Sequence, residues 1–163
     1  MTGRRFRRNP GDIVLVPLDD HRFSYARVLR EPLMEFYDGV ASSHDSADAQ
    51  NLSAMKPLFR IWVMNSAITS GRWKAVGHRA LSIEEQNRVD RFYKQDKLSK
   101  KLTIYWTDPV SQESHEVPAL LADCLPLERA AVWSAEHVED RLRDFHAGVK
   151  NKWVELSRPK SNG

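Results

Sequence analysis

The sequence predicts an α+β fold, either a small, strongly bent antiparallel sheet or a partly open SH3-like barrel, with two or three flanking helices. Short segments rich in apolar, β-branched and aromatic residues follow one another from Asp12 to Met64, separated by polar turns. Two later segments begin with a helix-capping serine, Ser82 or Ser134, followed by apolar residues at helical spacing. The chain has no internal repeat and no heptad pattern.

The first half of the chain predicts most of the sheet. We expect a strand over 12–18, a polar turn over 19–22, and strands over 23–30 and 33–38. Residues 41–57 are polar and turn-prone, which predicts a mobile surface loop. Strands over 58–64 and 73–76 follow.

In the second half, Ser82 and Glu85 form a capping box that predicts a helix ending near Gln95. Its buried stripe would be Val89, Phe92 and Tyr93, and a lysine cluster would lie near its negative end: Lys94, Lys97, Lys100 and Lys101. A strand is expected over 102–106, whereas 110–126 stays ambiguous because Pro118 and Pro126 limit any helix. We interpret 129–133 as a last strand.

Ser134 is predicted to cap a helix that runs to Phe145 and is stopped by Gly148. Val138, Leu142 and Phe145 would form its apolar face. The opposite side would carry four carboxylates: Glu136, Glu139, Asp140 and Asp144.

Length and composition predict one domain over residues 9–157, with a basic N-terminal arm over 1–8 and a disordered tail over 158–163. The 163 residues, 41% of them hydrophobic and 29% charged, are typical of a soluble globular protein. No apolar run approaches the roughly 18 residues of a membrane span, so we expect a cytoplasmic protein with no membrane partner.

The positive charge is concentrated at the N-terminus. The formal net charge is +3, but four of the 25 Lys and Arg residues are Arg4, Arg5, Arg7 and Arg8. The other 21 basic residues stand against 22 acidic ones, a net charge of −1. Because a nucleic-acid binder usually spreads its basic residues over one face, we interpret the arm as a solvated end, with a phosphate-binding arm as the alternative.

The sequence predicts no catalytic residue, no metal and no cofactor. Cys124 is the only cysteine and lies among leucines, so we expect a small buried apolar side chain. The six histidines show no metal-ligand spacing, and neither a Gly-x-Ser-x-Gly elbow nor a glycine-rich phosphate loop occurs. We therefore expect a protein that is not an enzyme; an enzyme with an unrecognised site is the third-ranked interpretation.

Two binding interpretations remain. Gly71-Arg72-Trp73-Lys74, together with Arg4–Arg8, could serve a small-barrel module that binds nucleic acid, although we favour the five tryptophans as core residues. The acidic helix face could instead bind the basic surface of a protein, even though Arg141 and Arg143 interrupt it. The candidate partner-binding residues are Glu136, Glu139, Asp140, Asp144, Asp19 and Asp20.

An ordered series of motifs in the first half carries a family resemblance: Gly11-Asp12-Ile13, Pro17-Leu18-Asp19-Asp20, Phe23-x-Tyr25-Ala26-Arg27-Val28, Phe36-Tyr37-Asp38, Leu58-Phe59 and Gly71-Arg72-Trp73. The series resembles the immunity protein 26 family of bacterial polymorphic toxin systems, over about residues 11–81. The resemblance implies a non-catalytic protein that binds a cognate toxin domain and blocks it. It leaves the toxin's activity and this chain's oligomeric state open.

Overall fold

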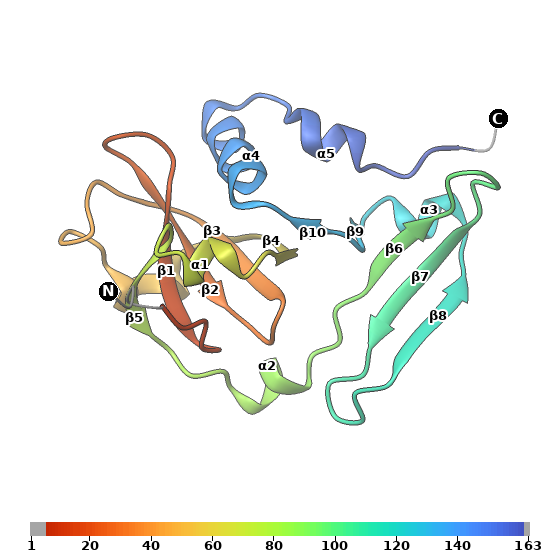
Figure 1. Cartoon of the computed structure of the whole chain (residues 1–163), viewed down its shortest axis with the longest axis horizontal. Coiled ribbons are helices and arrows are strands. Elements are labelled where there is room, and N and C mark those ends of the chain that lie inside the picture. The colour runs from red at the N-terminus through yellow and green to blue at the C-terminus, as the bar shows by residue number, and fades with distance from the viewer. Residues whose placement is uncertain (1–5, 162–163) are drawn as a thin grey trace. The chain divides into compact units, whose positions relative to one another are not determined.

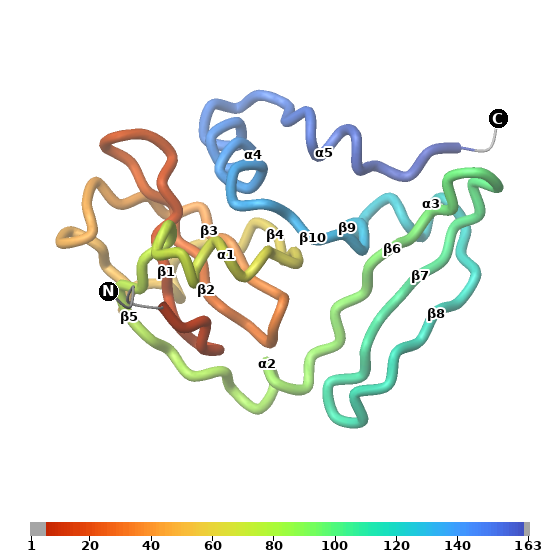
Figure 2. The backbone as a smooth tube through the Cα atoms, in the orientation of Figure 1, coloured from red at the N-terminus to blue at the C-terminus, as the bar shows by residue number. Residues whose placement is uncertain are grey.

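The computed structural model describes residues 6–161, and the chain divides into two units, each with its own sheet. Unit 1 comprises residues 1–81 and 132–151, and unit 2 comprises residues 82–131 and 152–163. The chain can be followed from unit 1 into unit 2, back into unit 1 and finally into unit 2 again (Figure 2). That residues 9–157 act as one domain stays a prediction.

The α+β class is confirmed by the elements of both units (Figure 1). Unit 1 contains β1 (Asp12–Pro17), β2 (Phe23–Val28), β3 (Leu33–Ala41), the 3-10 helix η1 (Ala49–Ala54), β4 (Pro57–Val63), α1 (Ser66–Thr69), β5 (Lys74–His78), β10 (Val132–Trp133) and α4 (Ala135–Ala147). Unit 2 contains α2 (Ile83–Asn87), β6 (Phe92–Gln95), β7 (Leu102–Thr107), β8 (Ser114–Pro118), α3 (Leu121–Cys124), β9 (Glu128–Arg129) and α5 (Lys152–Leu156).

The sheet of unit 1 has the strand order β10-β4-β3-β2-β1-β5 and is not closed into a barrel. Its neighbours are antiparallel except for the parallel pair β10 and β4. The four central residues of β1 are buried, as expected for a strand covered on both faces. Ile13 and Leu15 pack into a cluster with Leu52 of η1. On the opposite face Phe36 stacks on Phe59 with ring centroids 5.0 Å apart.

The prediction of a mobile loop over 41–57 is wrong for its second half. Residues 49–54 form η1, and the side chain of Leu52 is buried. The backbone N–H of Asp48 donates to the hydroxyl of Tyr25 at 2.7 Å. Burial of Leu52, with Ala49 and Met55 packed against the same cluster, holds this segment against the sheet, because it removes apolar surface from water.

The helix predicted from Ser82 to Gln95 is much shorter. Its capping box is confirmed, with Ser82 Oγ accepting from the N–H of Glu85 at 3.1 Å, but α2 ends at Asn87. Phe92 and Tyr93 are buried in β6 rather than in a helical stripe. Pairing with β7 overrides the local helical pattern. The lysine cluster therefore lies in and around the β6–β7 hairpin, not at a helix end.

The sheet of unit 2 has the order β8-β7-β6-β9. The ambiguous stretch 110–126 contains β8 and α3, and Cys124 is buried, as predicted. Burial raises the pKa of its thiol. The single strand predicted over 129–133 is divided: β9 pairs with β6 in unit 2, and β10 pairs with β4 in unit 1.

The last predicted helix is confirmed as α4. Ser134 Oγ accepts from the N–H of His137 at 3.3 Å, and Gly148 ends the helix with a φ of 71°, where a side chain would be strained. Val138 and Leu142 are buried, whereas Phe145 is 48% exposed. The apolar face of α4 is therefore narrower than predicted.

Candidate partner-binding surface

The structure brings two of the predicted acidic segments together in unit 1. Arg143 of α4 donates from Nη1 to the carbonyl oxygen of Leu18 at 3.0 Å and also forms an ion pair with Asp140. The β1–β2 turn therefore lies beside α4 (Figure 1). We define the α4–hairpin surface by six residues: Asp19, Asp20, Arg22, Glu136, Asp140 and Arg143.

Within the turn, Asp19 and Asp20 have different surroundings. Asp19 accepts from the backbone N–H of His21 at 2.9 Å and from Nε of Arg22 at 2.7 Å. Both hydrogen bonds lower the pKa of Asp19, and the bond from the Arg22 side chain has the larger effect. Asp20 is exposed and forms no side-chain hydrogen bond or ion pair with any residue that the structure describes. Its carboxylate is free to meet a partner.

Glu139 does not lie on an exposed acidic face as the helical pattern predicted. It is only 5% exposed and accepts from Nε of Arg72 at 2.8 Å and from Nη2 of Arg72 at 2.7 Å. It also accepts from the indole N–H of Trp73 at 2.9 Å. This bidentate ion pair fixes α4 to the segment that precedes β5. Glu139 therefore supports the α4–hairpin surface and is not an exposed part of it.

The other predicted carboxylates of α4 differ in their exposure. Asp144 accepts from the side-chain amide of Asn151 at 2.9 Å, which ties the end of α4 to the segment that follows it. Glu136 lies 3.8 Å from Arg72 with its side chain 76% exposed. Glu136 and Asp20 are therefore the two most available of the six predicted carboxylates.

A histidine lies beneath one end of this surface. His146 Nε2 is buried and has no hydrogen-bond partner among the described residues. Burial lowers the pKa of His146 most, and the positive charge of Arg22 lowers it further. The ring is therefore mainly neutral at pH 7, and the charge of the surface comes from its carboxylates and arginines.

Two arginines of the nucleic-acid alternative, Arg8 and Arg72, are occupied by partners within unit 1, whereas Arg7 is exposed. Arg8 donates to the carbonyl oxygens of Val63 at 2.7 Å and Pro32 at 2.5 Å, and burial lowers its pKa. A side chain at Gly71 would meet the ring of Phe6 at 2.5 Å, so Phe6 packs closely on this glycine. The chain is thus packed against unit 1 from Phe6 onward, while Arg4 and Arg5 of the predicted arm lie outside the described residues.

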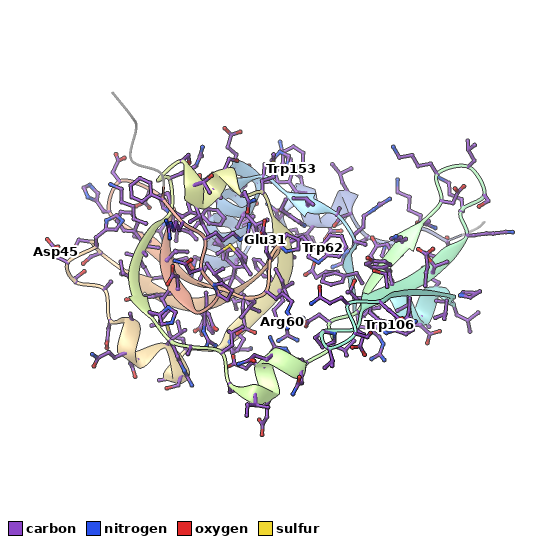
Figure 3. The ribbon with its side chains drawn as sticks, turned by 60° about the horizontal axis from the view of Figure 1, so that its bottom comes forward. Glu31, Asp45, Arg60, Trp62, Trp106 and Trp153 are labelled. Atoms are coloured by element: carbon purple, nitrogen blue, oxygen red, sulfur yellow. The ribbon has the colours of Figure 1, made fainter. Side chains whose placement is uncertain are left out.

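Another charged row crosses the sheet of unit 1. Glu35 is buried and accepts from the hydroxyl of Tyr37 at 2.5 Å and from Nη1 of Arg60 at 3.0 Å (Arg60 is labelled in Figure 3). Arg27, which faces Glu35 across β2 and β3, donates to the carbonyl oxygen of Arg79 at 2.6 Å. Burial raises the pKa of Tyr37, so the phenol stays protonated. Because the groups satisfy one another, we interpret the row as structural.

Among residues 6–161 no group of three or more His, Cys, Asp or Glu could hold a metal ion. In the same described part of the chain, no helix combines the length and apolar character needed to cross a membrane.

Comparison with known proteins confirms the family that the motifs suggested. The family model for immunity protein 26 matches residues 9–103, more than half of the chain. This chain belongs to the immunity protein 26 family. The matched segment begins before β1 and ends in β7. No curated protein and no solved structure matches the chain. Membership of this family supports the role of an immunity protein in toxin systems.

Proposed function

We propose that this chain neutralises a cognate polymorphic toxin domain by binding it and covering its active site or another essential surface. It acts without catalysis, in the cytoplasm of the cell that makes the toxin. The family match over residues 9–103 carries this proposal. The described part of the chain adds a charged, well-anchored surface suited to binding a protein.

The α4–hairpin surface is our candidate for the toxin contact. Arg143 and Glu139 hold α4 against its neighbours, so little conformational freedom is lost when a partner binds. Asp20 and Glu136 offer exposed carboxylates to a basic patch. Arg22 and Arg143 lie among the acidic residues and favour a partner with a matching alternation of charge.

Co-expression with the toxin domain encoded next to this gene tests both parts of the proposal. We expect growth to be rescued and a stable complex to be recovered by pull-down. The double variant D20K/E136K should weaken the complex by about tenfold, because both reversals place like charge against a basic patch. The matched control is D45K/E113K, since Asp45 is exposed in the loop after β3 (Figure 3) and Glu113 is exposed in the turn before β8.

The outcomes separate the function from its location. If the wild-type chain neither rescues growth nor forms a complex, the proposed function is wrong. If a complex forms and D45K/E113K weakens it as much as D20K/E136K does, the function stands and the α4–hairpin surface is not the contact.

A further inference from the structure

Unit 2 contains a groove of about 470 Å³ that is apolar inside and basic at its rim. Its aliphatic lining comes from Leu102, Pro118, Ala119, Leu120 and Leu121, and its rim carries Lys100, Lys101 and Lys160. We call it the lysine groove and define it by these eight residues. Leu120 is 74% exposed, so apolar surface is open to solvent beside the ammonium groups.

Hydrogen bonds of Gln95 build this groove. Its side-chain amide donates to the carbonyl oxygen of Lys160 at 2.7 Å and accepts from the N–H of Lys160 at 2.9 Å. It also lies 3.1 Å from the carbonyl oxygen of Lys100, to which it donates. One side chain therefore fixes the segment after α5 against the β6–β7 hairpin and brings together lysines that are far apart in the sequence.

The lysines of the groove lack paired carboxylates, whereas Lys94 of β6, outside the groove, pairs with Glu116 at 3.3 Å. Lys97, Lys101 and Lys160 form no side-chain hydrogen bond or ion pair with any described residue. Lys100 interacts electrostatically with the carboxylate of Asp96. The Oδ1 atom of Asp96 already accepts hydrogen bonds from the backbone N–H groups of Leu98 and Ser99. Like charges held together without counterions repel one another, and this repulsion is relieved when an anionic ligand binds.

The lining determines which anion fits. Strands of nucleic acid are held by aromatic stacking and arginine, and the groove is lined by neither. The aliphatic lining instead suits an apolar side chain. Addition of a strand at β8 is disfavoured, since Pro118 lacks the N–H that would extend the hydrogen-bond ladder.

We propose that the lysine groove receives a segment of the toxin domain in which carboxylates flank an aliphatic side chain. The source of the segment rests on the proposed function, whereas its chemistry rests on the groove alone. The contact is additional to the α4–hairpin surface, and its charge requirement is the opposite.

The first experiment measures binding of the full chain to a short fluorescent peptide that alternates glutamate with leucine. The variant K100E/K101E should bind the peptide at least about tenfold more weakly, because attraction becomes repulsion. The control K56E/K150E makes the same charge change at exposed lysines of unit 1 and should bind within about twofold of the wild type. A peptide with glutamine in place of glutamate should lose as much affinity as the K100E/K101E variant does.

Three results of the peptide experiment would overturn the inference: equal peptide binding by the two double variants, tighter binding of single-stranded DNA than of the peptide, or no peptide binding at all. The single variant K160E, tested in the same way, replaces K100E/K101E if circular dichroism shows that the double variant has not folded.

Titration with the toxin domain is the second measurement. If the wild type binds the toxin and K100E/K101E binds it equally well, this inference fails while the proposed function stands. If the wild type does not bind the toxin, the proposed function fails, and the peptide decides whether the groove takes acidic segments.

Discussion

The α4–hairpin surface and the lysine groove treat their charges in opposite ways. On α4 and the β1–β2 turn most carboxylates already have a donor, as with Asp19 and Arg22 or Asp140 and Arg143. In the lysine groove the rim ammonium groups share no paired carboxylate among the described residues. Pairing within the chain orients side chains and fixes elements, whereas unpaired charge is left for a ligand.

The difference extends to what each region holds in place. In unit 1, Glu139 uses both carboxylate oxygens to tie α4 to Arg72 and Trp73. In unit 2 the neutral side chain of Gln95 performs the corresponding task for the segment after α5. Because Gln95 is neutral, it holds Lys160 without reducing the positive charge of the groove. Glu139 is negative, so it cancels the positive charge of Arg72. The following experiments test this contrast, beginning with the largest expected effect.

Replacing Glu139 with alanine should destabilise unit 1 by about 2–4 kcal/mol, because the buried indole N–H of Trp73 and the guanidinium of Arg72 lose their acceptor. Urea unfolding followed by tryptophan fluorescence measures the change. Glu136→Gln is the control and should cost about 0.5 kcal/mol or less, since that side chain is exposed. Equal losses for the two variants would show that Glu139 is not an anchor.

Replacing Arg8 with alanine should cost about 1–2 kcal/mol in the same unfolding experiment, because the carbonyl oxygens of Val63 and Pro32 lose a charged donor. Arg7→Ala removes the same charge from an exposed neighbour and should change stability by less than about 0.5 kcal/mol. If Arg8→Ala changes the free energy of unfolding as little as Arg7→Ala does, packing and not Arg8 holds the segment after Phe6.

Gln95→Ala should weaken binding of the glutamate–leucine peptide about threefold, because Lys160 is no longer held at the rim while every lysine keeps its charge. Anisotropy titration measures the affinity. The exposed Gln50 offers a matched control, and Gln50→Ala should leave the affinity unchanged. An unchanged affinity for Gln95→Ala would mean that the clamp does not shape the groove.

The smallest effect concerns Asp96 in the β6–β7 turn. Hydrogen bonds from the backbone N–H and the hydroxyl of Ser99 lower its pKa, so the contribution of Asp96 to stability is present above its unfolded pKa of about 3.9 and is lost as pH falls through the lower folded value. Ser99→Ala removes the hydroxyl bond and should raise the NMR titration midpoint of Asp96 toward its ordinary value. Ser161→Ala is the control, and a midpoint that moves equally in both variants would contradict the assignment.

Much of the fold follows from the sequence because its signals are local. Alternating and continuous apolar runs identified the strands of unit 1 to within a few residues. Ser82, Ser134 and Gly148 marked helix boundaries correctly, since capping bonds join residues only a few positions apart. The motifs of the first half also identified the family.

The tertiary structure decided what depends on distant partners. A capping box starts a helix but does not set its length, and pairing of β6 with β7 moved Phe92 and Tyr93 into a strand. Residues 129–133 were divided because their two halves pair with different sheets. These outcomes depend on strands that come together only in the folded chain.

The candidate sites show the same division. Sequence spacing placed Glu136, Asp140 and Glu139 on one helix but gave no sign that Arg72 and Trp73 would cover Glu139. The sequence likewise grouped Lys100 with Lys101 but not with Lys160. Gln95 bonds to the backbone of both Lys100 and Lys160 and so brings these two lysines together. The sequence by itself determined the first strands of unit 1, the starts of two helices and the charges that these elements carry, because those properties arise from neighbouring residues. Only the tertiary structure decided that Glu139 is covered and that Lys160 joins the other lysines, because Glu139 and Gln95 bond to segments more than sixty positions away.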